Sequence, residues 1–345
     1  MICDCSVIIK IFISNTKKYE RGAFMRGWQF TTTHEPLKLI EKEDPKAKKG
    51  YVVLDVKAAG LCHSDVGALE DEGWLGLISK RPCILGHEFA GVITEIGPGV
   101  EGYKVGDKVG VCPMFASDGT GPSYGRDGGY ATKSAVPAEM LVPVPEGVTF
   151  AQAAAATDAG MTSYHAVVGV GGVKPGMKVG ILGVGGLGQI GARIAVLQGC
   201  EVYASSRNSA AREKAIALGC KETVATAEEL AQFNLDVIID FAGSGDTTAK
   251  ALEAVGHRGR VVVVGMAKLE TTINTMTLIV KQAEVVGSNG GSVQDIADVY
   301  KLIAAGELDP EIIEIGFEEV ASGLEKLKEG GIKGRMVALI KDEDR

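Results

Sequence analysis

The chain has 345 residues, a length that suggests about two domains, each large enough to bury its own core. Its composition, 46% hydrophobic and 23% charged, is that of a folded globular protein and excludes disordered and collagen-like classes. A formal net charge of −8 leaves no basic face for a phosphate backbone, so nucleic acid is not an expected partner.

The N-terminal segment MICDCSVIIKIFISN is apolar, but it lacks a basic opening and is interrupted by Lys10. This pattern argues against a signal peptide or a membrane anchor. The residues after Met25 are typical of the first strand of a domain, so we interpret residues 1–24 as an extension without a catalytic role, and translation could begin at Met25. Seven cysteines without the density of a disulfide scaffold suit a reducing compartment, and we expect a cytoplasmic protein.

The pattern of hydrophobic residues changes near Phe150. Between Gly50 and Pro145, short β-branched runs separated by Gly, Pro and Asp indicate an all-β unit with a barrel-like or sandwich core. After Phe150, apolar helical stretches alternate with short hydrophobic strands, which predicts parallel βαβ architecture. After Ser292 the pattern is helix, strand, helix and a last strand, RMVALI, and this tail could return to the first domain.

A glycine-rich motif lies between an apolar strand and an apolar helix in KVGILGVGGLGQIGARIA. Gly183, Gly185 and Gly188 have the G-x-G-x-x-G spacing, with Gly186 and Leu187 between them. The first glycine permits the tight turn, the second lets a pyrophosphate approach the backbone, and the third lets helix and strand pack closely. The helix N-terminus attracts the phosphate charge, so we predict a dinucleotide site.

The end of the next strand, CEVYASSRN, predicts the choice of dinucleotide. An acidic side chain normally binds the adenosine ribose of NAD at this place, but here Ser206 and Arg207 follow the strand. No carboxylate repels a phosphate, the hydroxyl can bind one, and the guanidinium can neutralise it, so NADP(H) should be preferred over NAD(H). The alternative is that Arg207 is an ordinary solvated turn residue.

Cys62 and His87 are candidate metal ligands. Cys62 follows a strand in AAGLCHSD, and His87 precedes one in GHEFAGVITEIGPGV. Thiolate and imidazole are typical ligands of Zn²⁺, and an open catalytic zinc site takes three protein ligands, so a third is required. Taken singly, each residue could instead be part of a packed core.

The segment GHEFAGVITEIGPGV resembles the signature of the zinc-containing medium-chain alcohol dehydrogenases, with Gly91, Gly97 and Val100 in register. The resemblance extends from Met25 to KGRMVALI and implies a β-rich GroES-like catalytic domain joined to a Rossmann domain with a doubly wound parallel sheet. The implied domains are the catalytic zinc-binding domain (25–158), the Rossmann domain (159–295) and a C-terminal segment returning to the catalytic domain (296–345). It is closest in pattern to the secondary-alcohol and cinnamyl-alcohol branches, and it implies a homodimer or homotetramer.

The resemblance also implies roles for individual residues. Asp158 stands where the family usually has a cysteine as third zinc ligand. In the secondary-alcohol branch of the family an aspartate takes this role, and the resemblance implies the same for Asp158. Glu88 resembles the carboxylate behind the metal that can transiently approach it, and Asp65 resembles the partner of the zinc-bound histidine. Ser64 matches the hydroxyl that hydrogen-bonds the substrate oxygen, and His63 matches a residue that contacts the cofactor pyrophosphate. Thr162 matches a neighbour of the nicotinamide, and Arg335 matches the C-terminal arginine that binds the pyrophosphate.

Besides Asp158, two further departures from the family pattern matter. The lobe that binds a structural zinc through four cysteines is missing, because the corresponding region offers only Cys112; one zinc per subunit is expected. The onward relay histidine is absent as well, because Gly67 stands at its position, so protons must leave through ribose hydroxyls or water.

These features together predict an oxidoreductase that interconverts alcohols and aldehydes or ketones, acting on small molecules without a membrane partner. One alternative is an NADPH-dependent quinone or enoyl reductase of the same superfamily, which works without metal. A second alternative, from another class, is a non-catalytic relative that retains only cofactor affinity. Cys62, His87 and Asp158 argue against the first, and these residues with Ser64 argue against the second.

Overall fold

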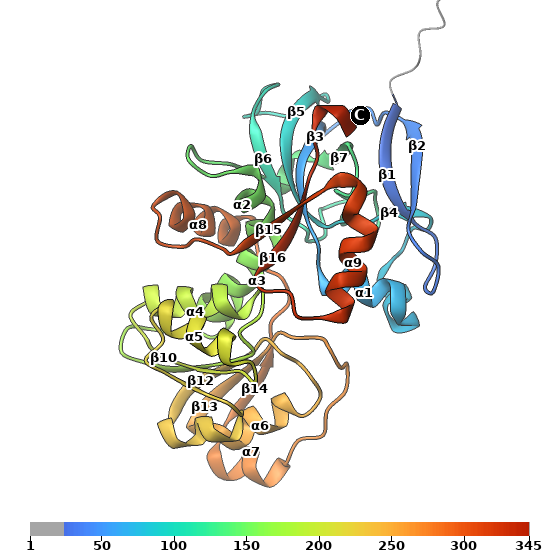
Figure 1. Ribbon diagram of the computed structural model, residues 1–345. Helices are drawn as coiled ribbons and strands as arrows, with labels where there is room; N and C mark the ends of the chain where they lie inside the picture. Colours follow the sequence, from blue (N-terminus) through green and yellow to red (C-terminus); the bar gives the residue numbers. More distant parts are fainter. Residues whose placement is uncertain (1–23, 345) are drawn as a thin grey trace, which may run out of the picture.

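The computed structural model describes residues 24–344, which form two units, one above the other in Figure 1. The upper unit contains the first strands together with the C-terminal strands and helices, and the lower one contains the yellow and orange segments. The interpretation of residues 1–24 as an extension falls outside the described residues except at Phe24, which already belongs to the first strand.

The upper unit is built on two mainly antiparallel sheets. The smaller sheet has the order β2-β1-β4, and the larger has the order β15-β16-β3-β5-β6-β8, with β7 also paired to β3. Their strands are β1 (Phe24–Phe30), β2 (Lys38–Glu43), β3 (Tyr51–Gly60), β4 (Cys83–Ile84), β5 (Glu88–Ile96), β6 (Lys108–Val111), β7 (Lys133–Pro137), β8 (Leu141–Pro143), β15 (Ile312–Gly316) and β16 (Arg335–Leu339).

The long strands β3 and β5 form the centre of the larger sheet. β3 is rich in valine and alanine, and most of its side chains are buried. A side chain at Gly91 of β5 would meet the backbone oxygen of Asp55 at 2.2 Å, so only glycine fits where the two strands approach. The C-terminal strand β16 pairs antiparallel with the end of β3, Val337 lying opposite Gly60. The start of β16 therefore lies beside the residues that follow β3.

The lower unit contains a six-stranded, fully parallel sheet. Its strand order, β11-β10-β9-β12-β13-β14, is the Rossmann order. From β9, the chain first adds strands on one side of the sheet and then, from β12, on the other side. The strands are β9 (Lys178–Leu182), β10 (Glu201–Ser205), β11 (Glu222–Val224), β12 (Leu235–Asp240), β13 (Val255–Val263) and β14 (Glu284–Gly287). The connecting helices are α4 (Gly188–Leu197), α5 (Ser209–Ala217), η5 (Glu228–Phe233), α6 (Thr247–Ala254) and α7 (Thr275–Lys281).

A continuous helical run leads from the β-rich unit towards β9, the first strand of the parallel sheet. It consists of α2 (Phe150–Ala155), the π-helical η3 (Ala156–Gly160), α3 (Met161–Tyr164) and the π-helical η4 (His165–Val170). A capping box between Thr149 and Gln152 starts the run, and its alanines are buried. π-Helical turns redirect side chains and occur frequently at functional sites, and Asp158 lies on the first of them.

The remaining helices are short and mostly cover the β-rich unit. They are α1 (His63–Glu70), η1 (Glu72–Leu77), η2 (Ala138–Met140), α8 (Val293–Ala304), η6 (Phe317–Glu319), α9 (Val320–Glu329) and η7 (Asp342–Asp344). Over residues 24–344, none of the helices has the length and apolar character needed to cross a membrane.

Candidate active site

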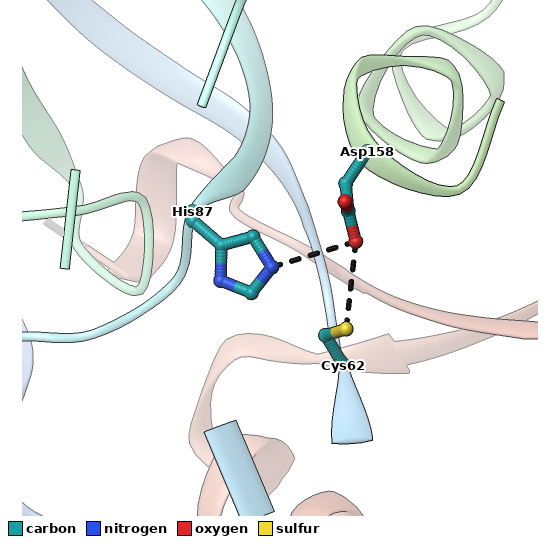
Figure 2. Close-up of side chains that lie close together, drawn as sticks. All are labelled: Cys62, His87 and Asp158. Atoms are coloured by element: carbon teal, nitrogen blue, oxygen red, sulfur yellow. Dashed lines mark hydrogen bonds and ion pairs between the residues drawn. The ribbon is translucent and has the colours of Figure 1, made fainter. Parts of the chain in front are cut away.

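Cys62, His87 and Asp158 come together although they are far apart in the sequence (Figure 2). Cys62 follows β3 and His87 precedes β5, and the strands pair antiparallel with Gly60 opposite Glu88. The end of one strand and the start of the other are therefore neighbours. Asp158 reaches the same point from η3, with Oδ2 at 3.4 Å from Sγ of Cys62 and 3.4 Å from Nε2 of His87.

This cluster fits a zinc ion. The three ligand atoms lie within 4.8 Å of one another, and no other such group of His, Cys, Asp and Glu occurs in the described part of the chain. Ligands at zinc bond lengths in a tetrahedral arrangement lie about 3.4–3.8 Å apart, close to the observed spacing. One sulfur, one nitrogen and one oxygen donor make a complete protein ligand set for an open catalytic site.

Asp65 orients His87 from behind the cluster. Its Oδ1 lies 3.3 Å from Nδ1 of the imidazole, which directs Nε2 towards Asp158. The Tyr130 hydroxyl donates to Oδ2 of Asp65 at 2.7 Å, and the backbone N–H of Cys62 donates to the same oxygen at 3.2 Å. Burial lowers the pKa of His87, but the Asp65 and Asp158 carboxylates outweigh it and hold that pKa well above its ordinary value. The electrostatic potential at the cluster is thus negative and favours a bound cation.

Glu88 and Arg335 form a buried ion pair beside the cluster. Nε of Arg335 donates to both Glu88 oxygens at 3.0 and 2.9 Å, and Nη2 also contacts Glu88. The same Nη2 donates to Oδ2 of Asp158 at 3.1 Å. Burial raises the pKa of Glu88 to about 7 in spite of the arginine. Direct approach of Glu88 to a metal, as the resemblance implies, would require this pair to open.

Ser64 and Thr162 add hydroxyl groups to the site. The Ser64 Oγ lies on the first turn of α1, 3.4 Å from Nε2 of His87. Thr162 donates from Oγ1 to Oδ1 of Asp158 at 3.2 Å. Thr162 therefore holds the candidate third ligand in place as well as facing the cleft.

A cleft of about 2040 Å³ joins the cluster to the glycine motif. Three of the predicted residues, Asp65, Glu88 and Arg207, do not line it. The predicted residues that do line it are Cys62, His63, Ser64, His87, Asp158, Thr162, Gly183, Gly185, Gly186, Leu187, Gly188, Ser206 and Arg335. Sequence-distant residues predicted to bind metal, substrate oxygen and cofactor thus share one cavity.

The glycine motif has the geometry that its spacing predicts. Gly183 has a φ of +84°, which favours glycine in the turn after β9. A side chain on Gly188 would meet the backbone oxygen of Gly183 at 1.8 Å, whereas one on Gly185 would meet nothing within 4 Å. The backbone at Gly185 is therefore open to a ligand. Gly186 faces Arg335, whose Nη1 lies 4.0 Å from the position of an added Cβ.

The turn after β10 places Ser206 on the cleft and Arg207 next to it in the sequence. Arg207 is exposed and lies near Asp246, whose pKa is lowered by Lys250 first and by Arg207 more weakly. Arg212 donates from Nη1 to the backbone oxygen of Ser206 at 2.6 Å. A second guanidinium therefore fixes this turn, a contact not predicted from the sequence.

Cys112 packs in the core. It is buried, and its Sγ lies 3.9 Å from Sδ of Met161. Burial raises the pKa of this thiol.

Aromatic residues at the site were not predicted from the sequence. The Tyr124 ring lies 5.8 Å from the His87 ring, and Tyr130 binds Asp65. Trp74 also lines the cleft. The segment YGRDGGY, which contains both tyrosines, has no periodicity that could have indicated these contacts.

Known proteins resemble the chain over almost its whole length. The family models for an alcohol dehydrogenase GroES-like domain and a zinc-binding dehydrogenase match residues 48–146 and 186–305. An alcohol dehydrogenase of Geobacillus stearothermophilus is 30% identical over 326 residues, 88% of this chain and 96% of the relative. Acetophenone reductase from Geotrichum candidum, solved in complex with NAD, has a TM-score of 0.85 at 28% identity and covers 93% of this chain and 98% of its own.

A further solved structure is the cobalt- and zinc-bound thermostable alcohol dehydrogenase of Pyrobaculum aerophilum. It has a TM-score of 0.82 at 28% identity, and the match covers 92% of this chain and 100% of that chain. The chain belongs to the zinc-type medium-chain alcohol dehydrogenase family. The predicted family and the predicted fold class, a GroES-like domain with a Rossmann domain, are both confirmed.

Proposed function

We propose that this alcohol dehydrogenase is zinc-dependent, with one zinc per subunit, and interconverts alcohols and aldehydes or ketones with NADP(H) in preference to NAD(H). The observation that supports the proposal is the convergence of Cys62, His87 and Asp158 at the cleft that contains the glycine motif. Cys62, His87 and Asp158 would hold the metal, and the glycine motif with Arg335 would hold the pyrophosphate.

The bound groups would supply the two central elements of the chemistry: zinc as a Lewis acid at the substrate oxygen, and nicotinamide as the hydride carrier. Ser64, beside His87 on the cleft wall, is placed to hydrogen-bond the substrate oxygen and to take its proton during oxidation. Asp65 fixes the imidazole, which keeps Nε2 directed at the cluster. Gly67 offers no side chain to carry the proton onward, so ribose hydroxyls or water would receive it from Ser64.

The preference for NADP(H) rests on the turn after β10. Ser206 lines the cleft and no carboxylate follows the strand. Arg207 stands next to this hydroxyl and is exposed, so its guanidinium is free to meet a phosphate on the ribose. The nearby Asp246 carries the opposite charge and would compete weakly for that guanidinium.

The test is metal analysis of the purified protein combined with a panel of alcohols and carbonyl compounds, assayed with NADP(H) and NAD(H) before and after a chelator. We expect stoichiometric zinc, loss of turnover on chelation, and recovery on adding zinc back. If the protein contains no zinc and reduces quinones or enoyl compounds at a rate that the chelator does not change, the metal-free reductase is favoured instead. Absence of turnover with every substrate and both cofactors would favour a non-catalytic relative.

A further inference from the structure

Trp74 forms a wall of the cleft next to the candidate reaction centre. It lies on η1, only 8% of its surface is exposed, and it lines the same cavity as Cys62, Ser64 and His87. A tryptophan that is almost buried yet borders the cleft presents an edge or face of its indole to whatever occupies that space.

The indole is seated on Gly67. Ser64 and Gly67 lie three residues apart on α1 and therefore on the same face of the helix. A Cβ added to Gly67 would lie 2.6 Å from Cε2 and 2.7 Å from Nε1 of Trp74. Any larger residue at this position would displace the indole. The place of the missing relay histidine is thus covered by an aromatic ring, one helical turn from the hydroxyl proposed to bind the substrate oxygen.

Hydrogen bonds fix both ends of the segment that carries Trp74. At its start, Asp71 accepts from Gly73 N–H at 2.8 Å through its side chain and from Trp74 N–H at 3.1 Å through its backbone. After its end, Ser79 donates to the backbone oxygen of Tyr124 from N at 3.0 Å and from Oγ at 2.8 Å. Tyr124 lines the cleft as well, with its ring next to His87. Hydrogen bonds thus connect the segment that carries Trp74 to the backbone of Tyr124, the second aromatic residue of the cleft wall.

The cleft also has large exposed apolar side chains in its lining. Each of the four is about half exposed, and they come from both units: Leu77 49%, Phe115 58%, Met266 51% and Leu269 55%. Leu269 Cδ1 lies 3.7 Å from where a Cβ on Gly73 would stand, so the two units meet next to Trp74. Exposed apolar side chains gathered at one cleft indicate a route for an apolar ligand.

We propose that Trp74, seated on Gly67, is a specificity-determining residue that selects alcohols and carbonyl compounds bearing an aryl or comparably large flat apolar group. Such a group would pack against the indole while the oxygen points to Ser64 and the metal ligands. A short alkyl group would leave the same apolar surface in contact with water. This inference rests on the proposed function.

The kinetic test compares matched pairs, benzaldehyde with acetaldehyde and acetophenone with acetone, in the wild type and in Trp74→Ala. We expect the wild type to favour the aryl member of each pair, and Trp74→Ala to lower that ratio of kcat/KM by about tenfold or more. Trp74→Phe should keep most of the preference. Gly67→Ala should lower it, because it displaces the indole without removing it. Trp28→Phe is the matched control, because the other tryptophan does not line the cleft and donates to the backbone oxygen of Phe317; it should leave the ratio unchanged.

Fluorescence supplies a readout that needs no turnover. The chain has two tryptophans, so Trp74 is the only one left in Trp28→Phe. Benzyl alcohol added without cofactor should change its emission saturably, and ethanol at the same concentration should not. An active enzyme whose aryl preference is the same in Trp74→Ala, or a wild type that prefers short alkyl substrates, would overturn the inference and leave the proposed function standing. A protein that binds benzyl alcohol at Trp74 but turns over nothing would overturn the proposed function instead.

Discussion

Arg335 and Glu88 meet in a buried ion pair, with Nε of the guanidinium at 2.9 and 3.0 Å from the two carboxylate oxygens. The arginine is the first residue of the last strand and the glutamate is the first residue of β5. The guanidinium also bonds Asp158 and faces Gly186, so one side chain connects the candidate metal ligands with the glycine motif. The C-terminal strand thus contributes to both halves of the site.

Glu88→Ala should destabilise the protein strongly. The substitution leaves the Arg335 guanidinium, only 5% exposed, without its main counter-charge, and breaking a buried pair costs about 3–5 kcal/mol. Urea unfolding of the chelated protein measures the loss without a contribution from bound metal. The control is Lys301→Ala, which removes an exposed partner of Asp298 and should change stability by less than about 1 kcal/mol. Equal stability of the two variants would show that the buried pair contributes little.

Asp158→Ala should abolish zinc occupancy and turnover. It removes one of three ligand side chains, and because loss of an outer partner alone lowers metal affinity about 10–100-fold, loss of a ligand should exceed that range. NADP(H) binding, followed by fluorescence titration, should stay largely intact because the glycine motif is unchanged. Asp298→Ala, a surface carboxylate, serves as the control for the metal analysis. Full zinc stoichiometry in Asp158→Ala would refute the ligand role.

Arg207→Ala should weaken the use of NADPH selectively. A hydrogen bond to a charged group contributes about 1.5–3 kcal/mol, so kcat/KM with NADPH should fall by about tenfold or more. The value with NADH should hardly change, because that cofactor has no phosphate for the guanidinium to meet. Lys221→Ala, which removes a cation paired with Glu201 on the same unit, controls for a general loss of positive charge. A similar loss with both cofactors, or equal rates of the wild type with both, would contradict phosphate recognition.

Alkylation should distinguish Cys62 from the packed cysteines. Burial raises the pKa of Cys83 and of Cys220 to about 12, and the thiolate is the reactive form. Both should stay unmodified at neutral pH and react only as the pH rises towards 12 or the protein unfolds. Cys62 lines the cleft and should react in chelated protein but be protected by zinc. Peptide mapping by mass spectrometry measures each site, and labelling of Cys62 that ignores zinc would contradict its role as a ligand.

Local patterns were sufficient for the parts of the site that follow strands directly. The glycine motif is a short-range signal, because a tight turn, a close approach and a helix start must all occur within a few residues of β9. Tyr124 and Tyr130 could not be predicted in this way. Their contacts with His87 and Asp65 depend on how the loop before β7 folds back, and no periodic pattern of hydrophobic residues encodes that path.

The sequence by itself determined the kinds of elements, the identities of Cys62 and His87 as possible ligands, and the absence of a carboxylate after β10, since each is a property of residue type and short spacing. Asp158 was identified as a third ligand only through the family resemblance. Only the tertiary structure decided that these ligands meet and that Arg335 bonds Glu88 across 247 residues of chain. The physical reason is that antiparallel pairing of β3 with β5 and with β16 sets those distances, and pairing between distant strands is fixed by register and packing rather than by local spacing.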